Sequence, residues 1–153
     1  MSTLRWSLVL LMMVVGGAPP AAWGQASASL AQASDSAERS SAVARRIAAA
    51  FSEGDANRLL TPSADRIEIS LFGARTFYSS AQALYVLREF FRSHAPRHFR
   101  VRDVMETGTS CFVQGEYEQA RRARRLQVYV RLGQPEGADL WQIHEIRIEG
   151  PSG

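Results

Sequence analysis

The sequence has one cysteine, Cys111, and all 18 of its basic residues are arginine. A single cysteine excludes an internal disulfide, so packing alone must stabilise the fold. Cys111 lies in an apolar, strand-like stretch where no neighbour in the sequence would activate it, and we expect a buried, inert thiol. We attribute the absence of lysine to codon usage. The net charge of +3 falls to +2 without Arg5, which is too small to indicate a nucleic-acid partner.

Motifs for phosphate binding, nucleophilic catalysis and metal binding are also missing. The sequence has no Gly-rich phosphate loop and no Gly-x-Ser-x-Gly elbow. His94 and His98 have the i, i+4 spacing of paired metal ligands. However, Pro96 lies between them and breaks the helix that would align them, and no third ligand is evident. We therefore expect neither a metal site nor a cofactor.

Only one long apolar run occurs, at residues 6–15, directly after Arg5. Ala22-Trp23-Gly24 then has the small-x-small pattern of a cleavage site, so residues 1–24 predict a secretory signal peptide. An uncleaved membrane anchor is the alternative, although the run is short for a bilayer span. No cysteine follows the run to form a lipoprotein anchor. We expect an exported protein, periplasmic or secreted, with no integral membrane segment after signal cleavage.

The remaining chain, about 129 residues, is long enough for one domain with a real core. Residues 25–35 are rich in Ala, Ser and Gln and predict a flexible leader, because they offer little apolar surface to bury. A single domain is expected over 36–150, with a tail at 151–153.

Helical periodicity appears in two long segments. Val43, Ile47, Ala50 and Phe51 form an apolar stripe that predicts a helix from about residue 36 to Gly54. A short helical turn at 56–60 follows. A second long helix is predicted between a capping box, Ser79 with Gln82, and the Ala95-Pro96 pair.

Alternating patterns predict the strands. One covers 65–72, a short extended piece covers 76–78, and four consecutive strands cover 98–105, 110–118, 126–132 and 140–149. In the last strand, Trp141 and Ile143 have one parity and Ile146 and Ile148 the other. A β-bulge near His144-Glu145 would bring all four to one face. The order predicts an α+β domain with helices packed on the concave face of a strongly curved antiparallel sheet.

This order, with the blocks "FSEGDANRLLTPSADRIEISL", "FYSSAQALYVLREFF", "HFRVRDV" and "LWQIHEIRIEG", resembles the nuclear transport factor 2-like (cystatin-like cone) superfamily. Over Val43 to Gly150 it resembles an uncharacterised bacterial family, domain of unknown function 4783. The resemblance implies a cone-shaped fold. The superfamily includes isomerases, dehydratases and polyketide cyclases as well as non-catalytic binding or dimerising modules, and the family brings no assigned reaction or active-site residue.

In a cone of this kind, apolar side chains would fill or line the space between the helices and the sheet. The predicted members are Phe51, Leu84, Leu87, Phe90, Phe91, Val101, Val128 and Ile146. We expect the Phe90-Phe91 pair mainly to seal the core, leaving a small apolar cavity that could hold a small apolar ligand.

An enzyme would place an acid and a base on inward positions. Asp103 shares the parity of Phe99 and Val101, so regular pairing would point it inward as a general base. The alternative is a twist at this point that exposes the carboxylate. His144 is a second candidate, although the expected bulge leaves its direction open. Tyr78 and Tyr85 could assist by donating hydrogen bonds, or could simply cover the mouth of the cone.

Two surface features remain. Arg121, Arg122, Arg124 and Arg125 surround the tip of a predicted hairpin, where cross-strand pairs with Glu116 and Glu118 would neutralise part of the charge. The tip lacks Asn-Gly or Asp-Gly, so we expect a longer loop, which is either a solvated basic tip or an anion-binding site. Phe112 and Tyr129 are expected on the outer sheet face, where exposed aromatic rings often mark an interface.

Two functional hypotheses follow. The first is an exported, non-catalytic domain that binds a small apolar ligand or a protein partner and forms a homodimer. The second is an enzyme of the isomerase or dehydratase kind, with Asp103 as base and Tyr78, Tyr85 or His144 assisting. We favour the first, and we expect no nucleic-acid partner.

Overall fold

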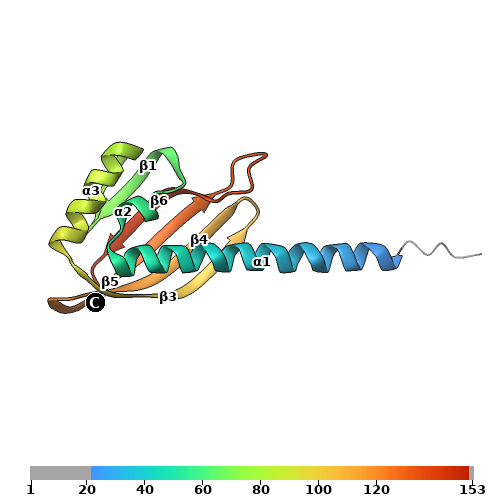
Figure 1. Cartoon of the computed structure of the whole chain (residues 1–153), viewed down its shortest axis with the longest axis horizontal. Coiled ribbons are helices and arrows are strands. Elements are labelled where there is room, and N and C mark those ends of the chain that lie inside the picture. The colour runs from blue at the N-terminus through green and yellow to red at the C-terminus, as the bar shows by residue number, and fades with distance from the viewer. Residues whose placement is uncertain (1–21, 152–153) are drawn as a thin grey trace, which may run out of the picture. The chain divides into compact units, whose positions relative to one another are not determined.

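A computed structural model describes residues 22–151 of the chain, with side chains from residue 28 onward. The chain divides between Ala33 and Ser34 into two compact units, and the fold below is that of the unit that begins at Ser34. The described elements, labelled in Figure 1, are α1 Ala22–Glu53, α2 Ala56–Leu59, β1 Ser63–Leu71, β2 Ala74–Ser79, α3 Ser80–Ser93, β3 Pro96–Thr107, β4 Ser110–Gln119, β5 Arg122–Gly133 and β6 Gln142–Glu149. None of the helices described is long and apolar enough to cross a membrane.

Helix α1 begins earlier than the sequence pattern predicts. Residues 25–35, predicted as a flexible leader, are helical in the structure. The prediction rested on the lack of apolar surface to bury. The segment is, however, rich in alanine, the residue with the highest intrinsic helix propensity, and it extends a helix that is already formed at residues 36–53. The predicted signal peptide, residues 1–24, lies almost entirely outside the described residues and stays a prediction.

The six strands form one sheet in the order β2-β1-β6-β5-β4-β3. The last four strands pair in succession and antiparallel, as predicted, whereas β1 pairs parallel with β6 and antiparallel with β2. Figure 1 shows the second half of α1 crossing the strands β3 to β6. The α+β cone is therefore confirmed, with β2 and β3 as the two edge strands.

Aromatic packing organises the core between the helices and the sheet. The Phe51 ring stacks on Phe99 at a centroid distance of 4.8 Å and meets Phe91 and Tyr117 edge-on, at 5.8 Å and 6.1 Å. Both Phe90 and Phe91 are buried, with their rings 5.6 Å apart. The predicted role of the Phe90-Phe91 pair as a seal of the core is confirmed.

The predicted bulge in β6 is also present. Arg131 pairs with Glu145 and Leu132 pairs with Ile143, so His144 is an extra residue without a pairing partner. This one-residue shift lets odd-numbered residues before the bulge and even-numbered residues after it face the helices. All four apolar side chains are buried as a result: Trp141, Ile143, Ile146 and Ile148.

A close approach at Gly115 lets the core close over β4. A Cβ atom at this position would lie 2.3 Å from Cζ of Phe99 and 2.7 Å from the carbonyl oxygen of Arg100. Neither neighbour can move away, because the Phe99 ring is stacked on Phe51 and Arg100 belongs to the paired strand β3. Only glycine fits here without displacing the central ring of the core.

We therefore expect Gly115→Ala to lower the free energy of unfolding by about 1–3 kcal/mol through overpacking. Gly150→Ala is the matched control, since a Cβ there meets nothing within 4 Å. Its effect should stay within about 0.5 kcal/mol. Urea denaturation followed by circular dichroism measures both, and equal stability of the two variants would contradict the packing argument.

Cys111 is fully buried beside the end of β3, as predicted for an inert thiol. Burial and the nearby Glu106 carboxylate raise the pKa of the Cys111 thiol to about 11, against a smaller lowering effect of the Ser40 hydroxyl. Glu106 itself accepts hydrogen bonds from Ser36, at 2.5 Å, and from Ser40. These contacts join α1 to β3 through one carboxylate.

This raised pKa predicts how stability depends on pH. The folded state holds the Cys111 proton where the unfolded chain has released it, so stability should fall as the pH rises from about 9 to about 11. The contribution is on the order of 2 kcal/mol. Cys111→Ala should flatten this part of the stability profile, measured by urea denaturation at several pH values. An unchanged profile would show that the thiol does not contribute.

Candidate functional site

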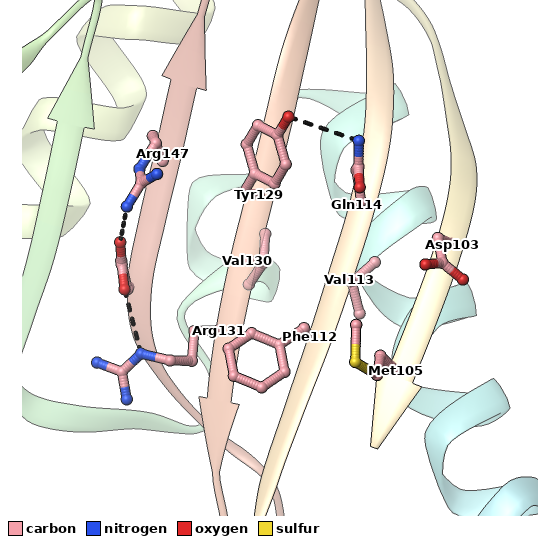
Figure 2. A pocket seen from close by; sticks show the side chains of 10 residues that line it. Asp103, Met105, Phe112, Val113, Gln114, Tyr129, Val130, Arg131 and Arg147 are labelled. Carbon is pink, nitrogen blue, oxygen red and sulfur yellow. Dashed lines mark hydrogen bonds and ion pairs between the residues drawn. The ribbon is translucent and has the colours of Figure 1, made fainter. Parts of the chain in front are cut away.

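The outer face of the sheet, which points away from the helices, carries a hollow of about 300 Å³. Figure 2 shows its side chains in front of the strands, with the helices behind. Along β4 and β5, outward residues alternate with buried valines of the core, as expected for strands with one covered face. Ten residues line the hollow: Asp103, Met105, Phe112, Val113, Gln114, Tyr129, Val130, Arg131, Glu145 and Arg147.

Strand pairing arranges the outward side chains in two rows across β3, β4, β5 and β6. The first row is Asp103, Gln114, Tyr129 and Arg147, and the second is Met105, Phe112, Arg131 and Glu145. Each row runs from a residue of β3 to a charged residue of β6. The centre of the face therefore carries two aromatic rings and the amide of Gln114. The carboxylate of Asp103 lies on the β3 side, and the guanidinium groups of Arg131 and Arg147 lie towards β6.

The centre of the face is markedly exposed for its residue types. Met105 is 54% exposed, Phe112 40% and Tyr129 37%. The Gln114 amide lies 3.5 Å from the Tyr129 hydroxyl, an interaction drawn in Figure 2. Contiguous exposed apolar groups of this kind are typical of an interaction surface. The predicted outward positions of Phe112 and Tyr129 agree with the structure.

The β6 flank is held by a carboxylate between two guanidinium groups. Glu145 accepts from Nε of Arg131 at 3.1 Å and from Nη2 of Arg147 at 2.9 Å. Burial raises the pKa of Glu145, but the hydrogen bonds from Arg131 and Arg147 outweigh burial and leave the pKa below its usual value. Arg147 also lies 3.9 Å from a carboxylate oxygen of Glu149, so two negative and two positive charges meet on this flank.

The β3 flank carries Asp103, whose side chain takes the exposed direction expected as the alternative to an inward-facing base. Val101 pairs with Gly115 and Asp103 pairs with Gln114, so Arg102 is an extra residue in β3. This bulge reverses the parity after Val101 and places Asp103 on the outer face, exposed to solvent. The carboxylate accepts a hydrogen bond from the N–H of Val104 at 2.9 Å and makes no ion pair with any described residue.

The other acid–base candidates lie on elements other than that of Asp103: His144 on β6, Tyr78 on β2 and Tyr85 on α3. His144 is half-buried next to Gly133, and burial together with Arg131 lowers its pKa. Two strands separate β6 from β3, so their residues are about 14 Å apart. Tyr85 is 74% exposed on α3, while Tyr78 packs on the core from β2. These four side chains do not form a convergent acid–base pair.

The eight residues predicted to line an apolar pocket all belong to the core or pack against it. Leu84 and Val101 are partly buried, and the other six are buried: Phe51, Leu87, Phe90, Phe91, Val128 and Ile146. Their role as the wall of a ligand cavity stays a prediction. Over the part of the chain that the structure describes, no group of three His, Cys, Asp or Glu side chains could hold a metal ion.

The arginine-rich hairpin differs in part from its prediction. Arg125 pairs with Glu118 at 3.0 Å and with Glu116 at 3.3 Å, which confirms the expected cross-strand ion pairs. The expected longer loop is wrong, because Gln119 pairs with Arg122 across a two-residue turn. Residues 123–124 after the turn have no pairing partner and form a bulge. A bulge increases the local twist of the strands, so the two-residue turn can form without the glycine that a tight hairpin turn usually contains.

A second hollow, of about 140 Å³, lies between this turn and the end of α3. The residues Arg121 and Arg122 line it together with Gln119 and with residues 92–95. The sequence pattern missed Gln119 and Arg92 because they lie in separate elements. It could have placed Gln114 and Arg147 on the outer face, since they share the outward parity of Phe112 and Glu145.

Comparison with solved structures places the fold among nuclear transport factor 2-like proteins. A domain of unknown function 4783 protein from Bacteroides uniformis has a TM-score of 0.65 at 22% identity, covering 71% of this chain and 97% of that chain. A putative ketosteroid isomerase from Kribbella flavida has a TM-score of 0.53 at 17% identity, covering 76% and 80%. A putative dehydratase of the NTF2-like family from Streptomyces avermitilis has 0.56 at 10%, covering 76% and 96%.

These likenesses concern the fold, because identities this low do not carry a reaction or its residues to this chain. No curated protein matches the sequence. The model of the family described as "Domain of unknown function (DUF4783)" matches residues 44–149, which include the core, both hollows and the two bulges. The chain belongs to this family.

Proposed function

We propose that the protein is a non-catalytic binding module that forms a homodimer through the outer face of its sheet. One observation carries the proposal: the row Asp103, Gln114, Tyr129 and Arg147 is complementary to a reversed copy of itself. Homodimers are commonly two-fold symmetric, and such an interface must be self-complementary.

The expected geometry follows from the strand order. A two-fold axis parallel to the strands, between β4 and β5, would place β3 of one copy against β6 of the other. Asp103 would then face the partner's Arg147, and Gln114 would face the partner's Tyr129. The Asp103 carboxylate, which has no ion pair with any described residue of its own chain, would gain a cationic partner.

The second row supports the same arrangement. The same axis would bring Phe112 against the partner's Arg131, and a guanidinium over an aromatic ring is an attractive pair. On this axis Met105 would lie opposite the partner's Glu145, whose carboxylate is already paired with Arg131 and Arg147 of its own chain. An apolar centre with a charged rim is the usual composition of a protein–protein interface.

Catalysis is less well supported. Isomerase and dehydratase names occur among proteins of similar fold, but Asp103 is exposed and the other candidates do not converge on it. A second copy is also favoured over a small apolar ligand, because aromatic rings pack in the core while exposed apolar side chains gather on the outer face. The apolar run of residues 6–15 supports the further proposal that the protein is exported.

The apolar centre is tested by Tyr129→Glu, which places a charge in the middle of the proposed interface. We expect the dimer dissociation constant to rise roughly a hundredfold, because a buried unpaired charge is costly. Tyr85→Glu makes the same change on the exposed surface of α3 and should leave it unaltered. Sedimentation velocity over a concentration series measures both, and a monomeric wild-type protein would contradict the proposal.

The rim is tested by reversing charges. Asp103→Arg should weaken the dimer by roughly tenfold or more, since it replaces two symmetry-related attractions by repulsions. Adding Arg147→Asp in the same chain restores opposite charges at both contacts and should recover much of the affinity. The effect should shrink at high salt. If the double variant were weaker than the single one, the proposed axis would be wrong.

A further inference from the structure

We propose that one end of the sheet docks on an anionic lipid surface, with the phenyl ring of Phe72 entering the lipid and arginines around it binding the headgroups. This basic end consists of the β1–β2 turn (72–73), the end of α3 with the start of β3 (92–97), and the β4–β5 turn (120–124). Figure 1 shows the end of α3 and the β4–β5 turn at the lower left. None of these residues lines the hollow on the outer sheet face, so the proposal is independent of the dimer.

Phe72 is exposed in a backbone conformation that disfavours it. Leu71 pairs with Ala74, so Phe72 and Gly73 alone form the β1–β2 turn, and their φ angles are 52° and 88°. A two-residue turn with positive φ favours Asn, Asp or Gly at its first position, and a phenylalanine there is strained. The Phe72 side chain is nevertheless 52% exposed to solvent. Strain that is kept at an exposed apolar ring indicates a function beyond stability.

Ring contacts and backbone hydrogen bonds join the parts of the basic end. The Phe72 ring lies 5.5 Å from the ring of His94, which stacks on Phe90 at 4.8 Å. The N–H of Ala120 donates to the carbonyl oxygen of Ala95 at 2.8 Å, which holds the β4–β5 turn against the same segment. His94 also lines the hollow between that segment and the turn. The exposed ring and the turn therefore belong to one preorganised surface, which lowers the entropic cost of binding.

The charge of the basic end comes from arginines that the fold leaves without carboxylate partners. Four exposed arginines make no ion pair with any residue that the structure describes: Arg97, Arg121, Arg122 and Arg124. The last carboxylates of α3, β4 and β6, those of Glu89, Glu118 and Glu149, each lie within ion-pair distance of another arginine. The basic end thus presents uncompensated positive charge, which is complementary to the phosphates of anionic lipids.

A lipid surface fits this end better than an acidic protein does. The core of a protein–protein interface needs a contiguous apolar area. Among the described residues of the basic end, however, Phe72 is the only large apolar side chain that is exposed. A membrane needs no such area, because one projecting ring can enter the boundary between headgroups and acyl chains while arginines stay at the level of the phosphates.

The proposed dimer would present two basic ends to one membrane. Its two-fold axis is parallel to the strands and keeps their direction, so the basic ends of both copies would point the same way. Two attachments to one surface strengthen binding without any new contact. A single copy retains the whole basic end, so a monomer that binds lipid would contradict only the dimer.

Insertion of the ring is tested by Phe72→Trp, with Phe77→Trp as the matched control because Phe77 is 57% exposed on β2. The full chain is added to vesicles of phosphatidylglycerol and phosphatidylcholine in equal parts, with brominated acyl chains that quench nearby tryptophan. We measure the emission that each substitution adds to the wild-type signal. This added emission should fall at least about twofold for Phe72→Trp and should persist for Phe77→Trp. Equal quenching of both, or of neither, would overturn the proposal.

The role of the strained ring is tested by Phe72→Asn. Asparagine tolerates the left-handed conformation, so relief of strain should offset the lost ring contacts and the urea midpoint should move by less than about 0.5 M. Binding to the same vesicles, measured by co-sedimentation, should weaken roughly tenfold. The apolar run of residues 6–15 is common to all variants, so their differences report the basic end. Unchanged binding, or a large loss of stability, would show that the ring serves packing alone.

The role of the charge is tested by Arg121→Ala with Arg122→Ala, which should weaken vesicle binding roughly tenfold or more. Arg45→Ala with Arg88→Ala removes the same charge elsewhere and should leave binding unchanged. The affinity should also fall at high salt and without phosphatidylglycerol. Equal losses in both arginine pairs, or equal affinity for vesicles of phosphatidylcholine alone, would overturn the proposal. Binding to poly-L-glutamate as tight as to vesicles, and unaffected by Phe72→Asn, would assign this end to an acidic protein instead.

Discussion

The alternation of side chains along the strands, and its interruption at two positions, determines what each face of this sheet presents. A strand without irregularities places every second residue on the helix-facing side, and a single extra residue exchanges the two sets. At His144 the exchange buries Ile146 and Ile148 together with Trp141 and Ile143. At Arg102 it places Asp103 outside. A one-residue bulge thus completes the core at β6 and places a carboxylate on the outer face at β3.

The core imposes a second constraint, because its centre is built from rings. Phe51 lies between the end of α1 and the sheet, and its contacts with Phe91, Phe99 and Tyr117 join α1, α3, β3 and β4. Gly115 allows this assembly by leaving room for the Phe99 ring. A fold shared with isomerases and dehydratases is here closed by aromatic packing, with the candidate acid–base residues kept apart.

The two bulges also explain how far the sequence could predict the structure. Around His144 the apolar residues change parity on both sides, and this signal is sufficient to locate the bulge. In β3, Met105 continues the parity of Phe99 and Val101, so the apolar pattern does not locate the bulge, and the sequence leaves both directions of Asp103 open. The capping box of Ser79 and Gln82 was predictable because its interactions are local. The start of α1, the short turn after β4 and the hollow at Gln119 were not, because propensity, twist and long-range proximity decide them.

The free edges of the sheet bear on how copies of this protein can meet. Strand β3 has one unpaired side, but it begins at Pro96, carries Arg100 and Arg102, and bends at its bulge. At the other edge, β2 is only six residues long and includes Arg75. Charge, proline, bulges and short length all hinder a further strand from docking in register. Open-ended growth by strand addition is thereby discouraged. The proposed contact between two sheet faces would instead close on itself, because it uses the same face of both copies.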